Sequence, residues 1–150
     1  MGPLKDRSRD WLGQARHALG QAEWLLLGDY HDGACFHSQQ AAEFALKALR
    51  HSLGMKGWGH DLEHLIEDLP TTVHVTGRIV QAAARLDELY ILTRYTNGFE
   101  DGSPKDKYTI RDARTAISHA KTIIGFCEEA LGSEGGAHAQ APALRPGPRR

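Results

Sequence analysis

The sequence predicts an all-α protein, an up-and-down antiparallel bundle of four long helices plus one short helix. Three observations support this fold class. Apolar residues recur at three- and four-residue steps in four separate segments. No segment sustains the alternation of apolar and polar residues that is typical of a strand. The predicted helices are joined mostly by short loops, as in antiparallel bundles.

The first two helices are expected at residues 8–27 and 32–53. Each carries an apolar stripe rich in alanine and leucine, and each ends at a glycine, Gly28 and Gly54. The six residues from Gly54 to Gly59 contain three glycines, so we expect them to form a loop.

A short helix is expected at residues 61–69, before Pro70, and a longer one at 76–94 with Thr76 as its cap. Residues 96–107 are polar and are expected to form a long loop, a kind of segment that is often functional or mobile.

The last helix is expected at residues 109–131. Thr109 and Asp112 have the spacing of a capping box at its start. We therefore expect residues 1–131 to form the helical domain. Residues 132–150, rich in Gly, Pro, Ala and Arg, are expected to be a disordered tail.

Composition restricts the class of function. Lysine plus arginine total 18 and aspartate plus glutamate total 19, so the basic surplus that is usual in nucleic-acid binders is missing. Cys35 and Cys127 lie among apolar neighbours and are expected to be free, buried thiols. There is no signal-peptide pattern and no long apolar run, so we expect a cytoplasmic protein with no membrane partner.

The second predicted helix carries a polar stripe opposite its apolar face, formed by Gln39, Gln40, Glu43, Lys47 and Arg50. The simplest interpretation is a solvated surface with one Glu43–Lys47 pair across a helical turn. The two glutamines beside an acid and a base could equally line a groove that hydrogen-bonds a polar ligand.

Four sequence pieces occur in an order and spacing that resemble the HEPN family. They are QQAAEFALKAL (residues 39–49), GHDL (59–62), LTRY (92–95) and the pair Tyr108-Thr109. The resemblance covers residues 10–131, and over this range the chain is similar to the small stand-alone prokaryotic branch of the family. One departure lies after Arg94-Tyr95, where the family often has proline and aspartate and this chain has Thr96-Asn97.

The resemblance implies a helical bundle that is commonly a homodimer. It also implies a nucleotide-binding groove and pairing with a separately encoded minimal nucleotidyltransferase, in a toxin–antitoxin-like context. Lysine and arginine would contact phosphate and tyrosine would offer a stacking ring. The ligand-binding candidates carried over are Gln40, Glu43, Lys47, His60, Asp61, Arg94 and Tyr95. Asp61 could instead cap the short helix.

An alternative function is a metal-independent HEPN ribonuclease acting as a toxin. Such family members resemble one another in an arginine followed four to six residues later by a histidine, and Arg114 with His119 has that spacing. Histidine would move the 2′-hydroxyl proton and arginine would hold the phosphate. On an ideal helix the two side chains point about 140° apart, so one site would need helix distortion or a dimer. The tyrosine that often follows is replaced by Lys121.

His60 to His64 also fit the H-x-x-E-H pattern of inverted zinc peptidases. The predicted helix is only about two turns long, and a catalytic zinc needs a third protein ligand. We therefore expect no metal site, and no cofactor is evident apart from a possible nucleotide.

The sequence leaves three hypotheses. The first is a nucleotide- or partner-binding module without activity of its own, the second a purely structural dimeric adaptor, and the third the ribonuclease, for which RNA would be the substrate. A homodimer is further suggested by large aromatic residues in excess of what a small bundle must bury. They are Trp11, Trp24, Trp58 and Phe99.

Overall fold

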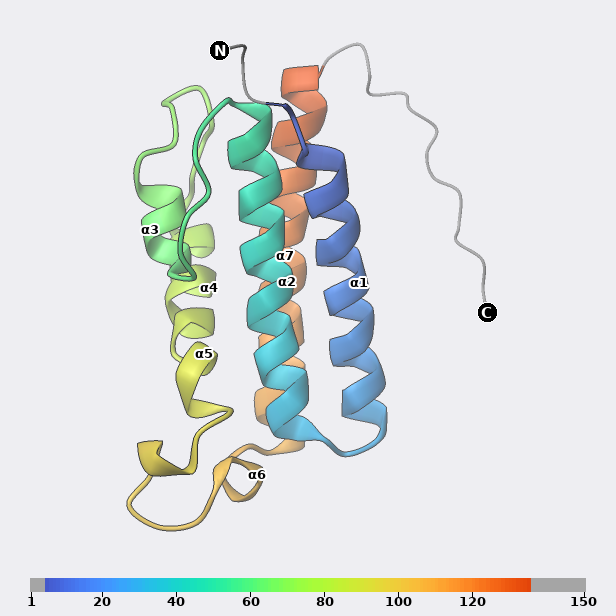
Figure 1. Ribbon diagram of the computed structural model, residues 1–150, viewed down its shortest axis with the longest axis vertical. Coiled ribbons are helices and arrows are strands. Elements are labelled where there is room, and N and C mark those ends of the chain that lie inside the picture. The colour runs from blue at the N-terminus through green and yellow to red at the C-terminus, as the bar shows by residue number, and fades with distance from the viewer. Residues whose placement is uncertain (1–4, 136–150) are drawn as a thin grey trace.

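The computed structural model describes residues 5–135, and within that range every regular element is a helix. The long helices run alternately down and up the molecule, with α7 behind α2 and α1 and α4 on either side (Figure 1). The predicted all-α bundle is confirmed. Its long helices are α1 (Ser8–Leu27), α2 (His31–Ser52), α4 (Gly77–Asp87) and α7 (Ile110–Gly135).

The shorter elements are α3 (Leu62–Glu67), α5 (Leu89–Leu92), the 3-10 helix η1 (Thr96–Gly98) and α6 (Pro104–Lys107). Three of them, α5, η1 and α6, correct the predictions. The single helix expected at 76–94 is divided at Glu88 into α4 and α5. The expected loop at 96–107 contains η1 and α6, because Ser103 and Asp106 form a capping box that starts α6.

Helix α2 is the centre of the bundle, because it packs along both α1 and α7. The three helices meet mainly through buried alanines, whose small side chains let the backbones approach closely. Cys35 and Cys127 are free and buried as predicted, and burial raises the pKa of the Cys35 thiol to about 12. The larger buried side chains that complete the core are Leu46, Leu49, Leu62, Leu65, Leu86 and Ile123.

The helix ends agree with the predictions in part. Thr109 and Asp112 cap α7 reciprocally: the Asp112 carboxylate accepts the Thr109 N–H at 2.9 Å, and the Thr109 hydroxyl accepts the Asp112 N–H at 3.2 Å. Thr76 precedes α4, but its side chain makes no capping hydrogen bond. Helix α7 continues to Gly135, beyond the expected end of the last helix at 131, and residues 136–150 of the predicted tail lie outside the described residues.

None of the helices within residues 5–135 is long and apolar enough to cross a membrane.

Candidate polar binding site

The polar stripe of α2 is buried except for the half-buried Gln40, which corrects its interpretation as a solvated surface. Gln39 is fully buried, and Glu43 and Lys47 are 1% and 8% exposed. The cover comes from the chain between α2 and α3, which brings His60 against Glu43. We call Gln39, Gln40, Glu43, Lys47 and His60 the polar site.

The Glu43 carboxylate is the centre of the polar site. It accepts hydrogen bonds from Lys47 Nζ at 2.9 Å, Gln40 Nε2 at 3.1 Å and Gln39 Nε2 at 3.4 Å. His60 Nδ1 lies 3.0 Å from Oε2, and because a carboxylate only accepts, this nitrogen carries the proton. A carboxylate removed from water is stable only when it is paired and hydrogen-bonded, and these four donors meet that requirement.

Aromatic rings and a cation extend the polar site toward the surface. The His60 imidazole is stacked on Tyr90 of α5, with ring centroids 4.4 Å apart. Arg94 follows one helical turn later, and its guanidinium carbon lies 4.6 Å from the Tyr90 ring, 4.5 Å from Phe36 and 5.0 Å from Tyr95. Arg94 Nε donates to the Tyr90 carbonyl at 2.9 Å. We call Phe36, Tyr90, Arg94 and Tyr95 the aromatic–arginine cluster.

Arg94 carries a positive charge that its surroundings leave unbalanced. Among the residues that the structure describes, no carboxylate lies within ion-pair distance of it. Its side chain is exposed, and the Tyr95 ring beside it is 51% exposed. A guanidinium in this state is suited to bidentate contact with a phosphate or carboxylate.

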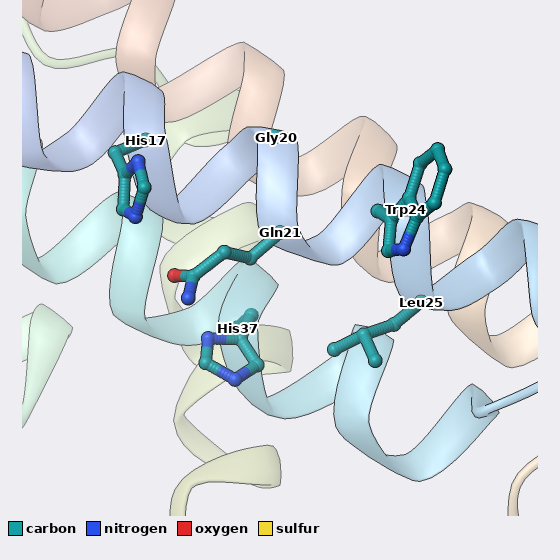
Figure 2. Close-up of a pocket in the computed structure, with 6 residues that line it drawn as sticks. All are labelled: His17, Gly20, Gln21, Trp24, Leu25 and His37. Carbon is teal, nitrogen blue, oxygen red and sulfur yellow. The ribbon is translucent and has the colours of Figure 1, made fainter. Parts of the chain in front are cut away.

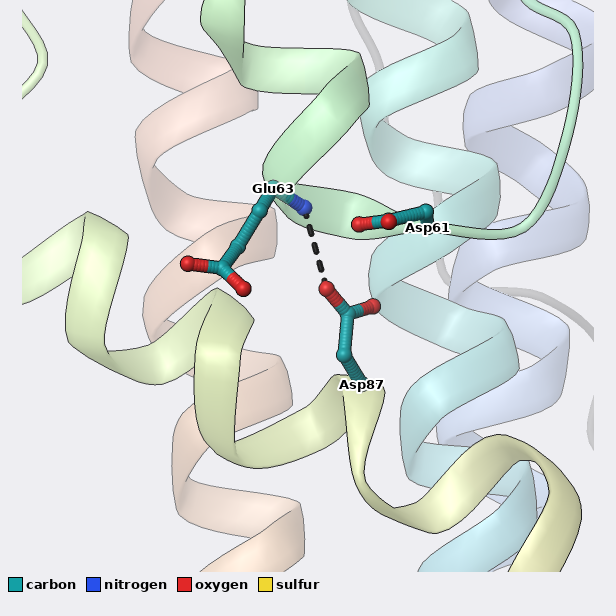
Figure 3. A group of neighbouring side chains, drawn as sticks. All are labelled: Asp61, Glu63 and Asp87. Carbon is teal, nitrogen blue, oxygen red and sulfur yellow. Dashed lines mark hydrogen bonds between the residues drawn. The ribbon is translucent and has the colours of Figure 1, made fainter.

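Asp61 serves as a helix cap and lies outside the polar site. Its carboxylate accepts the backbone N–H of His64 at 3.2 Å, as the capping prediction required. Asp87 at the end of α4 accepts hydrogen bonds from the two preceding N–H groups of α3, those of Leu62 at 2.7 Å and Glu63 at 3.1 Å (Figure 3). The first three N–H groups of α3 are therefore all satisfied by carboxylates.

The carboxylates of Asp61 and Asp87 form an acidic cluster with that of Glu63. Each of the three offers an oxygen within 4.8 Å of the others (Figure 3). Burial raises the pKa of Asp87 to about 7, and the neighbouring Asp61 adds to the shift. The pKa of Asp61 is lowered, chiefly by its hydrogen bond with Asp87. The hydrogen bonds to α3 account for the positions of Asp61 and Asp87.

The two histidines of the H-x-x-E-H pattern do not face a common point. His60 contacts Glu43 and Tyr90, whereas His64 is 71% exposed and lies 3.6 Å from Glu67. The sequence pattern therefore gives no pair of zinc ligands in this fold.

Arg114 and His119 lie on different sides of α7. Arg114 lines a shallow groove of about 360 Å³ together with Glu23, Leu26 and Lys121. His119 is half-buried, and burial and then the charge of Arg85 on α4 lower its pKa. Within one chain, the fold therefore does not bring the ribonuclease candidates into one site.

A second groove, of about 500 Å³, lies between α1 and α2 (Figure 2). The side chains of His17, Gln21 and His37 point toward one another in it, and Trp24 and Leu25 line it further along α1. Burial lowers the pKa of His37, with a smaller contribution from His17. None of the residues predicted to bind a ligand lines this groove.

The four large aromatic residues differ in their surroundings. Trp11 packs against Phe44 and donates from Nε1 to His51 at 3.1 Å, and Phe99 meets Tyr108 edge-on. Trp24 and Trp58 are 76% and 75% exposed.

Six of the seven ligand-binding candidates therefore lie in the polar site or the adjoining aromatic–arginine cluster. Tyr90, which connects the two groups, and Phe36, which packs against Tyr90, were not among the residues predicted from the sequence. Helical spacing could have found both, because Phe36 lies four residues before Gln40 and Tyr90 four residues before Arg94.

The fold and site define a class of small antiparallel helical bundles with a buried polar network on one side of the central helix. The family model described as HEPN domain matches residues 8–130, and the chain belongs to that family. No curated protein matches the chain.

Three solved structures resemble the whole fold. TT1696 from Thermus thermophilus is 43% identical, with a TM-score of 0.83 over 85% of this chain and 100% of that one. ST0689, an archaeal HEPN homologue, is 35% identical, with a TM-score of 0.71 over 85% and 99%. An HEPN domain protein from Thermotoga maritima, tm0613, is 29% identical, with a TM-score of 0.66 over 81% and 97%.

Proposed function

We propose that this HEPN protein is a nucleotide-binding module, in which Arg94 contacts the phosphates at the edge of the polar site. The observation that carries this proposal is the exposed Arg94 guanidinium, stacked among three aromatic rings and without a carboxylate partner in the described part of the chain. The rings hold the cation in place, which reduces the entropy lost when it binds an anion.

The buried polar network contributes to this site by positioning. Lys47 is already paired with Glu43, so its role is to hold the carboxylate that orients His60. His60 in turn stacks on the Tyr90 ring and holds it in place. The Arg94 guanidinium lies over the same ring, so its position depends on His60 as well. The exposed ring of Tyr95 next to Arg94 offers a face to the sugar.

The test is a thermal-shift panel of the four ribonucleoside triphosphates and the matching nucleosides. A triphosphate at 100 times its dissociation constant stabilises the protein by about 2.7 kcal/mol, which is a rise of several degrees in Tm. Arg94→Ala should abolish the rise. Arg85→Ala is the matched control, because Arg85 is an exposed arginine on α4 with only a 3.8 Å contact to Glu88. No rise with any triphosphate on the wild type would refute the proposal.

We further propose that the module acts as a homodimer accessory to a separately encoded minimal nucleotidyltransferase. The resemblance to the HEPN family supports the nucleotidyltransferase as the partner. The exposed apolar side chains at the α1–α2 turn, Trp24, Leu27 and Tyr30, support self-association. Analytical ultracentrifugation should show a dimer at micromolar concentration, and a purely monomeric profile would exclude it.

A further inference from the structure

The segment between α2 and α3 crosses the polar site and is anchored on both sides of Trp58. On one side, the buried Arg50 side chain donates to the Lys56 carbonyl and, at 2.9 Å, to the Leu65 carbonyl. On the other side, the His60 carbonyl accepts a hydrogen bond from Gln39 Nε2 at 3.1 Å. The backbone that carries Trp58 is thus held against the polar network.

The residues next to Trp58 are glycines for identifiable reasons. A Cβ at Gly57 would lie 3.1 Å from Lys47 Cγ, so any larger residue would have to push the Lys47 side chain aside. Gly59 has a φ of 85°, a conformation that L side chains rarely adopt. The backbone that precedes Trp58 therefore lies against the Lys47 side chain, and the turn at Gly59 follows it.

The Trp58 side chain is 75% exposed and has no aromatic or cation partner among residues 5–135. Trp11, whose ring lies 5.5 Å from Lys47 Nζ, is by contrast packed against Phe44 and hydrogen-bonded to His51. An indole on an anchored backbone with its ring unpaired is suited to receive a planar group.

We propose that Trp58 is the base-stacking residue of the nucleotide site and gives it a preference for purines. This inference rests on the nucleotide-binding proposal. The Tyr95 ring already has the Arg94 guanidinium over it at 5.0 Å, whereas the Trp58 indole has no such partner among the described residues. Trp58 lies two residues before His60, whose ring stacks on Tyr90, and the Arg94 guanidinium lies over the same Tyr90 ring. A base on Trp58 and phosphates on Arg94 would therefore place the ligand along His60 and Tyr90. Purines have the larger ring system and gain more from stacking on an indole.

Isothermal titration calorimetry of ATP and CTP tests this assignment on wild type, Trp58→Ala and Val80→Ala. Val80 is the control, because it is an exposed apolar residue on α4 and belongs to neither the polar site nor the aromatic–arginine cluster. Stacking on one aromatic side chain corresponds to roughly a tenfold or greater change in affinity. We expect Trp58→Ala to weaken ATP binding by about that factor and to reduce the ratio between the affinities for ATP and CTP. Val80→Ala should change neither the ATP affinity nor that ratio.

Inorganic tripolyphosphate separates this inference from the proposal beneath it, because it offers phosphates without a base. It should bind wild type and Trp58→Ala equally and lose affinity in Arg94→Ala. If ATP binds wild type and Trp58→Ala with the same affinity, Trp58 does not hold the base and the phosphate site stands. If neither ATP nor tripolyphosphate binds the wild type, the proposed function fails and the role of Trp58 fails with it.

Discussion

The polar site on α2 and the Arg114–His119 pair on α7 represent two ways in which polar residues can be related in a helical bundle. The polar site combines side chains that are distant in sequence, and Gln39 and Glu43 meet His60 through direct hydrogen bonds. Arg114 and His119 are only five residues apart, yet one lines a groove beside α1 and the other faces α4.

The difference shows that a short spacing on one helix is weak evidence for a shared site. Five residues on a helix turn the two side chains to different neighbours, whereas a loop folded back over a helix brings distant groups into contact. Burial separates the two regions further. Glu43 is 1% exposed and requires its partners, but Arg114 is exposed and requires none.

The largest expected effect is that of removing the centre of the polar site. Glu43→Ala leaves the Lys47 ammonium buried without its 2.9 Å partner, and breaking a buried ion pair in this way costs about 3–5 kcal/mol. Urea unfolding followed by circular dichroism measures the loss. Glu67→Ala is the control, because Glu67 is 75% exposed, and it should stay within about 0.5 kcal/mol of wild type.

A double variant makes the comparison sharper. Glu43→Ala combined with Lys47→Ala should be less destabilised than the sum of the two single variants, because the second change removes the orphaned charge. Additive losses would mean that the two side chains stabilise the fold independently, contrary to the network described above.

The fold could be predicted from the sequence because the signals were local. Helical periodicity and glycine breaks identify the long helices, and the Thr109–Asp112 spacing identifies the start of α7. The division of α4 from α5 was not predictable in this way. At that point Asp87 caps α3, and this contact depends on tertiary packing.

The candidate site was predicted in composition but not in environment. Periodicity places Gln40, Glu43 and Lys47 on one face of a helix, and a face of charged and amide side chains is ordinarily wet. Its burial comes from His60 and the backbone at Gly57, which fold over it from outside the helix. No helical pattern carries that information, although the family resemblance had already grouped His60 with the helix residues.

An intermediate effect is expected from pH at the acidic cluster. The folded-state pKa of Asp87 is about 7, above its ordinary value of 3.8, so the folded protein holds a proton that the unfolded chain releases earlier. A group of this kind contributes stability that is complete below pH 3.8 and is lost as the pH rises through 7. The loss between pH 5 and 8 should be about 1 kcal/mol, because solvent screens a half-buried group.

Asp87→Asn removes this titration, so its stability should fall less than that of wild type as the pH rises over the same range. The variant also loses one acceptor for the α3 N–H groups, which lowers its stability by a constant amount at every pH. Tm measured at half-unit steps of pH separates the slope from the offset. Asp101→Asn, at a site that is 93% exposed, should reproduce the wild-type slope, and an unchanged slope in Asp87→Asn would contradict the pKa assignment.

The smallest effect is expected at the α7 pair. Arg114→Ala removes an exposed side chain with no hydrogen bond among the described residues, so the free energy of unfolding should change by less than about 0.5 kcal/mol. His119→Ala should also leave the ATP-induced rise in Tm intact, because His119 faces Arg85 on α4 rather than the polar site. Urea unfolding measures the change in the free energy of unfolding. The thermal-shift assay used for Arg94→Ala measures the ATP-induced rise in Tm for both α7 variants. Loss of the ATP response in either α7 variant would move the functional site from α2 to α7 and make RNA cleavage the activity to assay.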